Sequence, residues 1–274
     1  MRKQLTTTRL PNNQEVFCLR ESEASILYQQ VQGYLKYGIN IEAGDTLFDV
    51  GANIGLFTLM ANDRCAGRAN IFAFEPVPDI FAVLKHNANR FNLEKIKTFQ
   101  ICLGRRSQTI DFAYYPNATA ISSLYPDSSG EEKKQFGKTI KENLAQLPFP
   151  INLVQLLPEP LLSFAIDRMV YFAYFEEKVE CQMKTISQVI AEQSVTQIDL
   201  LKIDVEKAEL DVIEGIEAQD WSKIQQIVVE VHNINNRVQR IVDLLQDKGF
   251  DVNREQDPIF KHLDIYTVYA KKAI

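Results

Sequence analysis

Short continuous runs of apolar residues alternate along the chain with stretches in which apolar residues recur at helical spacing. Continuous runs indicate buried strands, and helical spacing indicates helices packed on a sheet. The expected strands are residues 45–50, 70–76, 97–104, 109–115, 179–183, 197–204, 224–231, 250–253 and 263–270. The expected helices are residues 21–37, 78–91, 185–193 and 235–248, with one more starting at Leu56. This order predicts an α/β fold with a doubly wound, mostly parallel sheet that closes with a hairpin and has 263–270 on its edge side.

Residues 116–178 interrupt this alternation. Their first part is rich in turn residues, the middle carries mixed charges, and the last part is apolar but punctuated by prolines. So long an interruption is unusual unless it is a lid or a binding loop. We interpret it as an insertion that covers a site and influences substrate choice. A disordered loop is the alternative, but the apolar and aromatic content of 149–175 disfavours disorder throughout.

Residues 1–40 are expected to form an N-terminal cap, in which a short arm precedes the helix at 21–37. Tyr34 and Tyr37 fall just before the first core strand. Either they pack in the core, or the helix closes over a site and the tyrosines line it. Both fit a tyrosine, whose ring can pack while its hydroxyl bonds.

One glycine turn stands between the first core strand and the following helix. Asp49 ends the strand, Gly51 and Gly55 bracket the turn, and Asn53 lies between them. Glycine at these positions would let a ligand approach the backbone, and the free N–H groups of a helix start attract anionic groups. Glu75 ends the next strand about twenty residues later, the spacing at which an acid meets ribose hydroxyls in dinucleotide folds.

The turn differs from the G-x-G-x-x-G pattern because it has no middle glycine and has an acid at the strand tip. An acid there would meet a pyrophosphate badly but suits a ligand with a cationic amino-acid end, such as S-adenosylmethionine. An ordinary strand-to-helix turn without a ligand is the alternative interpretation.

A second set of polar residues lies at the ends of two later strands: Asp204, Glu206, Lys207, Glu230 and His232. The carboxyl ends of parallel strands meet at one crevice, so these residues should converge with the glycine turn and Glu75. This convergence favours an enzyme.

For methyl transfer to oxygen, His232 is the best candidate base because its ordinary pKa lies near neutral pH. Glu230 or Glu206 would orient it or place the hydroxyl, and Lys207 is the alternative base. The structural alternative is that Glu206 and Glu209 favour a helix start and that Lys207 is a surface residue. Asp204 and Glu230, with His232, could also hold Mg²⁺, although histidine is atypical for that ion and we favour a metal-free site.

Composition narrows the classes further. The 30 lysines and arginines and 36 acidic residues give a net charge of −6 and form no basic patch, which disfavours nucleic acid. The four cysteines have no C-x-x-C pair, so a disulfide framework or a zinc site is not expected. The start of the chain lacks the apolar core of a signal peptide, and no apolar run approaches the length of a membrane span. We expect a soluble, cytoplasmic protein.

With these residues identified, the chain resembles the FkbM family of S-adenosylmethionine-dependent methyltransferases over residues 34–270 outside the insertion. The matching stretches are 37–39, 44–46, 48–55, 74–76, 201–206 with Glu209, and 229–232. Lys207 stands where the family usually has a glycine. Residues 10–12 and 122–126 are similar to methyltransferase domains of cyanobacterial polyketide and peptide synthetases.

The resemblance implies one methyltransferase domain, residues 1–274, with a Rossmann-like class I sheet of seven strands, the last antiparallel, and an inserted lid. The residues expected to bind S-adenosylmethionine are Asp49, Gly51, Asn53, Gly55, Glu75, Pro76, Leu103 and Asp204. The residues expected to contact substrate are Tyr34, Tyr37, Ser122 and Ser123.

The function implied is O-methylation of a hydroxyl on a natural-product intermediate, which could be carried on an acyl carrier protein beside synthetase modules. Two alternatives stay open. One is an NAD(P)-dependent oxidoreductase on a similar sheet, which the missing middle glycine disfavours. The other is a non-catalytic docking domain, which the acids at several strand tips disfavour.

Overall fold

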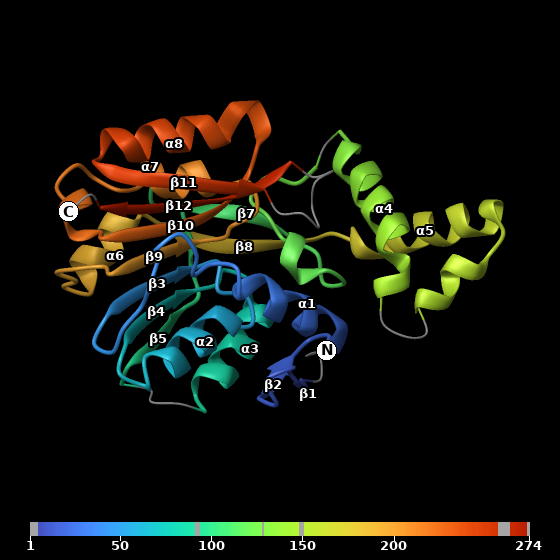
Figure 1. Cartoon of the computed structure of the whole chain (residues 1–274), viewed down its shortest axis with the longest axis horizontal. Helices are drawn as coiled ribbons and strands as arrows, with labels where there is room; N and C mark the ends of the chain where they lie inside the picture. Colours follow the sequence, from blue (N-terminus) through green and yellow to red (C-terminus); the bar gives the residue numbers. More distant parts are fainter. Residues whose placement is uncertain (1–4, 91–93, 128, 148–150, 257–263, 273–274) are drawn as a thin grey trace.

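A seven-stranded sheet forms the centre of the molecule in this computed structural model, which describes residues 5–90, 94–127, 129–147, 151–256 and 264–272 (Figure 1). Its order is β11-β12-β10-β9-β3-β4-β5. β12 pairs antiparallel with both β10 and β11, and the other neighbours are parallel. The predicted seven-stranded sheet with an antiparallel last strand is therefore confirmed. The strands are β3 (Thr46–Val50), β4 (Asn70–Phe74), β5 (Ile96–Phe99), β9 (Leu200–Ile203), β10 (Gln226–His232), β11 (Phe250–Gln256) and β12 (Ile265–Lys272).

The edge of the sheet differs from the prediction. β11 is the outer strand, and β12 inserts between β11 and β10. The exposed polar side chains of Asp251, Asn253 and Arg254 suit an edge, whereas Val268 and Ala270 of β12 are buried. The order of strands in a sheet depends on which strands pair, and the pattern of a single strand does not contain that information.

Helices cover both faces of the sheet, as the doubly wound topology requires. α1 (Glu21–Val31), α2 (Leu56–Arg64) and α3 (Pro78–Ala88) pack on one face. α6 (Ile186–Glu192), α7 (Glu209–Glu214) and α8 (Arg237–Asp247) pack on the other. No helix within the described ranges is long and apolar enough to cross a membrane.

The expected strand at 97–104 is two strands in different sheets. After β5 the chain turns away and forms β6 (Cys102–Leu103), which joins β7 (Gln108–Tyr114) and β8 (Glu177–Lys184) in a second sheet. The insertion runs from β7 to β8 and projects beyond the central sheet (Figure 1). Its helices are η1 (Thr119–Ile121), α4 (Glu131–Asn143), η2 (Leu144–Gln146), η3 (Ile151–Leu156) and α5 (Glu159–Ala173).

The N-terminal cap begins with a hairpin of β1 (Thr6–Arg9) and β2 (Glu15–Cys18). Its helix ends at Val31, six residues earlier than predicted. The N–H of Gly33 donates to the carbonyl of Gln30 in a turn, and Tyr37 and Gly38 have left-handed backbones that no helix can contain. The remaining short helices are η4 (Trp221–Lys223) and η5 (Ile234–Asn236).

The glycine turn after β3 is required by the protein itself. Gly51 has φ +75°, and a Cβ atom there would lie 1.7 Å from the carbonyl oxygen of Asp204. At Gly55, with φ +90°, a Cβ atom would lie 2.7 Å from Cδ1 of Leu84. From the sequence we expected these glycines to let a ligand approach the backbone. At Gly51 the structure shows instead that the loop after β3 lies against the backbone of the loop after β9.

We expect Gly51→Ala to destabilise the fold far more than Gly67→Ala, where φ is +70° but the space around the new methyl group is open. The control should lose about 1 kcal/mol, the cost of a left-handed alanine. Gly51→Ala should lose about 3 kcal/mol or more because a backbone carbonyl must also move. Urea unfolding followed by circular dichroism measures both, and equal losses would show that backbone conformation alone requires the glycine.

Candidate active site

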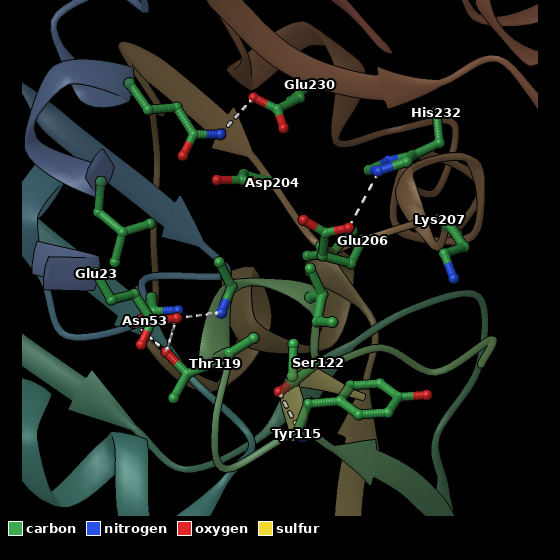
Figure 2. Close-up of a pocket in the computed structure, with 18 of the residues that line it drawn as sticks. Glu23, Asn53, Tyr115, Thr119, Ser122, Asp204, Glu206, Lys207, Glu230 and His232 are labelled. Atoms are coloured by element: carbon green, nitrogen blue, oxygen red, sulfur yellow. Dashed lines mark hydrogen bonds and ion pairs between the residues drawn. The ribbon is translucent and has the colours of Figure 1, made fainter. Parts of the chain in front are cut away.

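The carboxyl ends of β3, β4, β9 and β10 border one cavity of about 740 Å³ (Figure 2). Residues of the strand ends, of α1 and of the insertion line it together. Of the residues predicted from the sequence, those that line the cavity are Gly51, Asn53, Glu75, Pro76, Leu103, Ser122, Asp204, Glu206, Lys207, Glu230 and His232. Asp49, Gly55, Tyr34, Tyr37 and Ser123 do not line it.

Glu75 is held rigidly at the end of β4. One carboxylate oxygen accepts the N–H of Asn53 at 3.1 Å, and the other accepts the N–H of Val77 at 2.9 Å. Burial raises the pKa of Glu75 to about 7. Each oxygen keeps a further lone pair, so this carboxyl can also meet hydroxyl groups of a ligand in the cavity.

The side chain of Asp49 contacts other residues in the protein interior and does not line the cavity. It is fully buried and accepts a hydrogen bond from the hydroxyl of Thr58 at 2.6 Å. Its other oxygen lies 3.0 Å from Nζ of Lys202, the residue beside it on β9. The prediction that Asp49 contacts a cofactor directly is therefore wrong in its geometry: side chains on this part of β3 alternate between faces, and Asp49 faces α2.

Lys202 is a buried cation that the sequence analysis did not single out. Its Nζ donates to the carbonyl of Gly51 at 2.9 Å and lies 3.6 Å from Asp204. Burial lowers the pKa of Lys202, but Asp49 and Asp204 more than reverse this, and the net pKa is raised. The signal in the sequence was a lysine inside an otherwise apolar strand.

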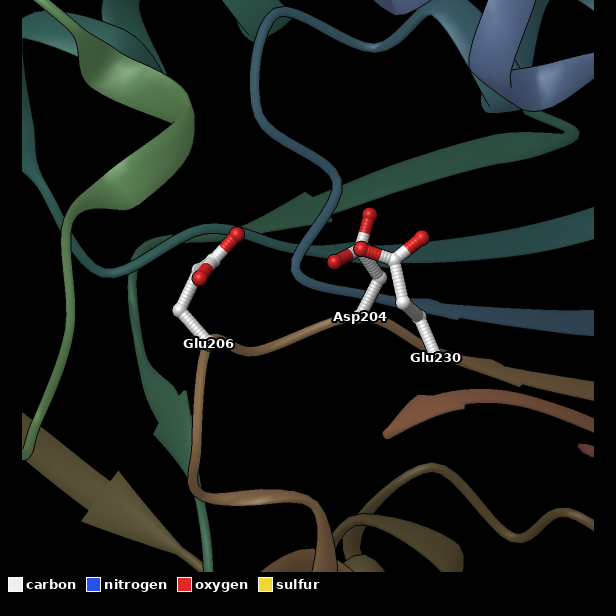
Figure 3. Close-up of side chains that lie close together, drawn as sticks. All are labelled: Asp204, Glu206 and Glu230. Atoms are coloured by element: carbon white, nitrogen blue, oxygen red, sulfur yellow. The ribbon is translucent and has the colours of Figure 1, made fainter. Parts of the chain in front are cut away.

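Three carboxylates converge in the cavity near the ends of β9 and β10. Asp204, Glu206 and Glu230 each bring an oxygen atom within 4.8 Å of the others (Figure 3). We call these three residues the acid cluster. Hard cations such as Mg²⁺ prefer oxygen ligands of this kind, so the acid cluster could hold one.

Tyr34 and Gln30 bind the acid cluster from α1 and its following turn. The hydroxyl of Tyr34 donates to Asp204 at 2.9 Å and lies 3.5 Å from Glu230, while Nε2 of Gln30 donates to Glu230 at 2.8 Å. Tyr34 thus packs its ring and bonds through its hydroxyl beneath the cavity. Tyr37 instead is exposed and lies against the ring of Tyr269, because the left-handed turn at this point carries it away.

The acid cluster carries less negative charge than three carboxylates would suggest. Burial, followed by repulsion from Asp204 and Glu206, raises the pKa of Glu230 to about 8. Burial also raises the pKa of Glu206, although His232 partly opposes this. At neutral pH the cluster therefore retains a proton, chiefly on Glu230.

His232 lies between two carboxylates. Its Nε2 is 3.1 Å from Glu206, and its Nδ1 is 2.9 Å from Glu209. Burial lowers the pKa of His232, but Glu206 and Glu209 reverse this and hold it well above its ordinary value. The raised pKa favours an imidazolium at neutral pH, in which both ring nitrogens donate to carboxylates and neither keeps a lone pair for a substrate proton. This arrangement disfavours the prediction that His232 is the base.

Glu209 at the start of α7 fixes this arrangement. It is fully buried and also accepts a hydrogen bond from Nη1 of Arg237 at 2.8 Å. Burial raises the pKa of Glu209, but His232 and Arg237 outweigh this and lower it. The sequence suggested only that Glu209 favours a helix start.

Lys207 joins the loop after β9 to the insertion. Its Nζ donates to Glu132 at 2.7 Å and to the carbonyl of Tyr125 at 2.9 Å, which leaves it poorly placed as a base. Glu206 and Lys207 both have positive φ, at 48° and 73°, which explains why a glycine would fit position 207 well.

The two predicted substrate serines differ. Ser122 lines the cavity, with its hydroxyl accepting the N–H of Tyr115 at 3.1 Å. Ser123 is fully buried and donates to the carbonyl of Glu206, so its role is to hold the loop. Glu23 of α1, which the sequence analysis missed, lines the cavity and accepts the hydroxyl of Thr119 and the N–H of Ala120, both at 2.9 Å.

Comparison with known proteins agrees with this fold. The sequence profile of the methyltransferase FkbM domain matches residues 49–252. The chain is 34% identical over 270 residues to 31-O-demethyl-FK506 methyltransferase FkbM of Streptomyces tacrolimicus, covering 97% of this chain and 96% of that protein. It is 30% identical over 250 residues to methyltransferase sdnD of Sordaria araneosa, covering 88% and 87% of the two.

Another relative is a much longer protein than this chain. The chain is 33% identical over 274 residues to AMB antimetabolite synthetase AmbE of Pseudomonas aeruginosa, covering 95% of this chain but only 12% of AmbE. Among solved structures, methyltransferase FkbM of Methylobacillus flagellatus superposes with a TM-score of 0.51 at 12% identity, over 87% of this chain and 47% of that one. The protein therefore belongs to the FkbM methyltransferase family.

Proposed function

We propose that this protein transfers a methyl group from S-adenosylmethionine to a hydroxyl of a natural-product intermediate. The observation that carries the proposal is that Glu75 and the acid cluster line one cavity at the carboxyl ends of strands of the same sheet. Glu75 would hold the cofactor, and the acid cluster would receive the hydroxyl and its proton.

The cavity residues fit this cofactor. Glu75 can accept ribose hydroxyls, the loop from Gly51 to Asn53 borders the same space, and the apolar side chains of Cys102 and Leu103 offer a surface for a nucleobase. Asp204 would meet the amino-acid end, where a carboxylate stabilises positive charge. When bound, S-adenosylmethionine would supply a methyl group on a positively charged sulfur.

The acceptor hydroxyl loses a proton when its oxygen forms the new bond to carbon. Glu206 is the residue we assign to take that proton, because it lines the cavity and its raised pKa makes it a stronger base than an ordinary glutamate. His232 keeps Glu206 in place through the contact between Nε2 and the carboxylate. In this role His232 is a positioning residue.

We propose that the site works without a metal ion. The imidazolium of His232 and the proton on Glu230 already offset much of the charge on the acid cluster. A bound Mg²⁺ at Asp204, Glu206 and Glu230 is the second arrangement that these oxygens permit.

The relatives support the natural-product setting. One is named for methylation of an FK506 precursor, and another is a synthetase of which this chain matches a small part. We infer that the acceptor is a product of such a pathway and that it is offered either free or on a carrier protein by a neighbouring module. Membership of the methyltransferase family leaves little ground for an NAD(P)-dependent oxidoreductase.

Glu75→Ala should weaken binding of S-adenosylhomocysteine about 10- to 100-fold, the usual loss for hydrogen bonds to a charged group. Isothermal titration calorimetry measures this directly. Asp79→Ala is the matched control, because Asp79 lies on the exposed start of α3 close to Glu75 and does not line the cavity. Wild-type protein that fails to bind millimolar S-adenosylhomocysteine would overturn the proposed function.

His232 should stay protonated on both ring nitrogens from pH 6 to above pH 7, because Glu206 and Glu209 raise its pKa. Nitrogen-15 NMR of the imidazole rings measures the protonation of His232 as a function of pH, and the His232→Gln variant assigns its signal. In Glu206→Gln the titration should move toward lower pH, since one carboxylate partner is lost. A wild-type midpoint near the ordinary value of about 6.5 would restore His232 as the candidate base.

Glu230→Gln should stabilise the protein at pH 8 but not at pH 5. The pKa of Glu230 is raised from 4.5 to about 8, so the folded protein retains a proton that the unfolded chain releases. Stability is therefore lost as pH rises through this window, and the variant should escape a loss of roughly 3 to 4 kcal/mol by pH 8. Thermal unfolding in EDTA measures the trend. Glu15→Gln, on the exposed edge of the hairpin, should follow the wild type.

A further inference from the structure

The insertion presents an apolar surface to the cavity. Its helices enclose a small core of Leu144, Leu162, Ile166 and Val170. Apolar side chains of the insertion also line the cavity, and some of them pack against this core. We call these lining side chains the apolar lobe, and it consists of Phe136, Ile140, Leu147, Met169, Phe172 and Tyr174.

Contacts between the insertion and the core fix the apolar lobe relative to the acid cluster. Glu132 of α4 pairs with Lys207, directly after Glu206 in the chain. The ring of Tyr174 packs on Tyr115 with centroids 5.5 Å apart, and the hydroxyl of Tyr115 donates to Glu176 at 3.0 Å. The lobe is therefore held as part of the same cavity that contains the acid cluster.

The cavity is divided by polarity. Carboxylates gather at the strand ends, where Asp204, Glu206 and Glu230 lie within reach of one another. Toward α5 the lining becomes apolar, and the one carboxylate that α4 contributes to the lining, Glu132, is paired with Lys207. A ligand whose body reaches α4 and α5 gains free energy from burying apolar surface against this part of the lining.

We propose that the methyl acceptor is an alcohol with an extended aliphatic body, whose hydroxyl meets the acid cluster while the body lies against the apolar lobe. This inference rests on the proposed function. The carboxylates of the acid cluster repel an anion, so the acceptor is uncharged next to its hydroxyl. A hydroxylated acyl chain carried as a thioester and a free aliphatic diol share this chemistry.

The binding test uses the fluorescent apolar probe N-phenyl-1-naphthylamine and its displacement by a series of 1,2-alkanediols. Affinity should rise about threefold for each added methylene up to the length of the lobe. Met169→Glu, which places a charge in the lobe, should weaken probe binding at least tenfold, and Ile140→Ser should weaken it less. Binding of S-adenosylhomocysteine should change less than twofold in both, which shows that they fold.

Phe164→Glu is the matched control, because Phe164 is on α5 but is 66% exposed and does not line the cavity. It should bind the probe like the wild type. Affinity that does not depend on chain length, or an equal loss in Phe164→Glu and Met169→Glu, would overturn the inference.

Methyl transfer then distinguishes the sources of the acceptor. With S-adenosylmethionine present, mass spectrometry compares decane-1,2-diol with 3-hydroxydecanoyl-pantetheine, each beside its four-carbon homologue. Methylation of the long diol supports a free acceptor, and methylation of the long thioester alone supports a carried one. No transfer to either by protein that binds S-adenosylhomocysteine overturns the inference, whereas loss of that binding counts against the proposed function.

Discussion

The buried ammonium group of Lys202 is the interaction on which the strand-end geometry depends. It pairs with Asp49, donates to the carbonyl of Gly51 and lies near Asp204, so it joins β9 to β3 just below the cavity. A carboxylate with no exposed surface, such as Asp49, is stable only with such a partner. The turn of Gly51 can then approach the backbone of Asp204 closely, which places both loops at the cavity.

A series of ion pairs leads to the acid cluster from α8. Arg237 pairs with Glu209, and Glu209 contacts one nitrogen of His232. The other nitrogen of His232 contacts Glu206, which borders the cavity. Each carboxylate is buried beside a cation, so its position is fixed before any ligand enters. Such preorganisation means that the carboxylates need no reorientation when a ligand binds.

The insertion supplies much of the apolar lining of the cavity. The core sheet supplies hydrogen-bonding groups at strand ends, whereas α4 and α5 supply apolar side chains. The ion pair between Lys207 and Glu132 connects the two parts at the loop that carries Glu206. The same loop therefore positions a polar group of the site and anchors the apolar surface that faces it.

The sequence by itself determined the alternation of strands and helices, the glycine turn and the acids at strand ends, because apolar periodicity and turn chemistry are local properties. Most of the site residues that it predicted do line the cavity. Only the tertiary structure decided that Asp49 faces Lys202, that Tyr37 points away, that β12 is internal and that His232 lies between two carboxylates. These features depend on which strands pair and on charges brought together from distant segments, and no local pattern encodes such contacts.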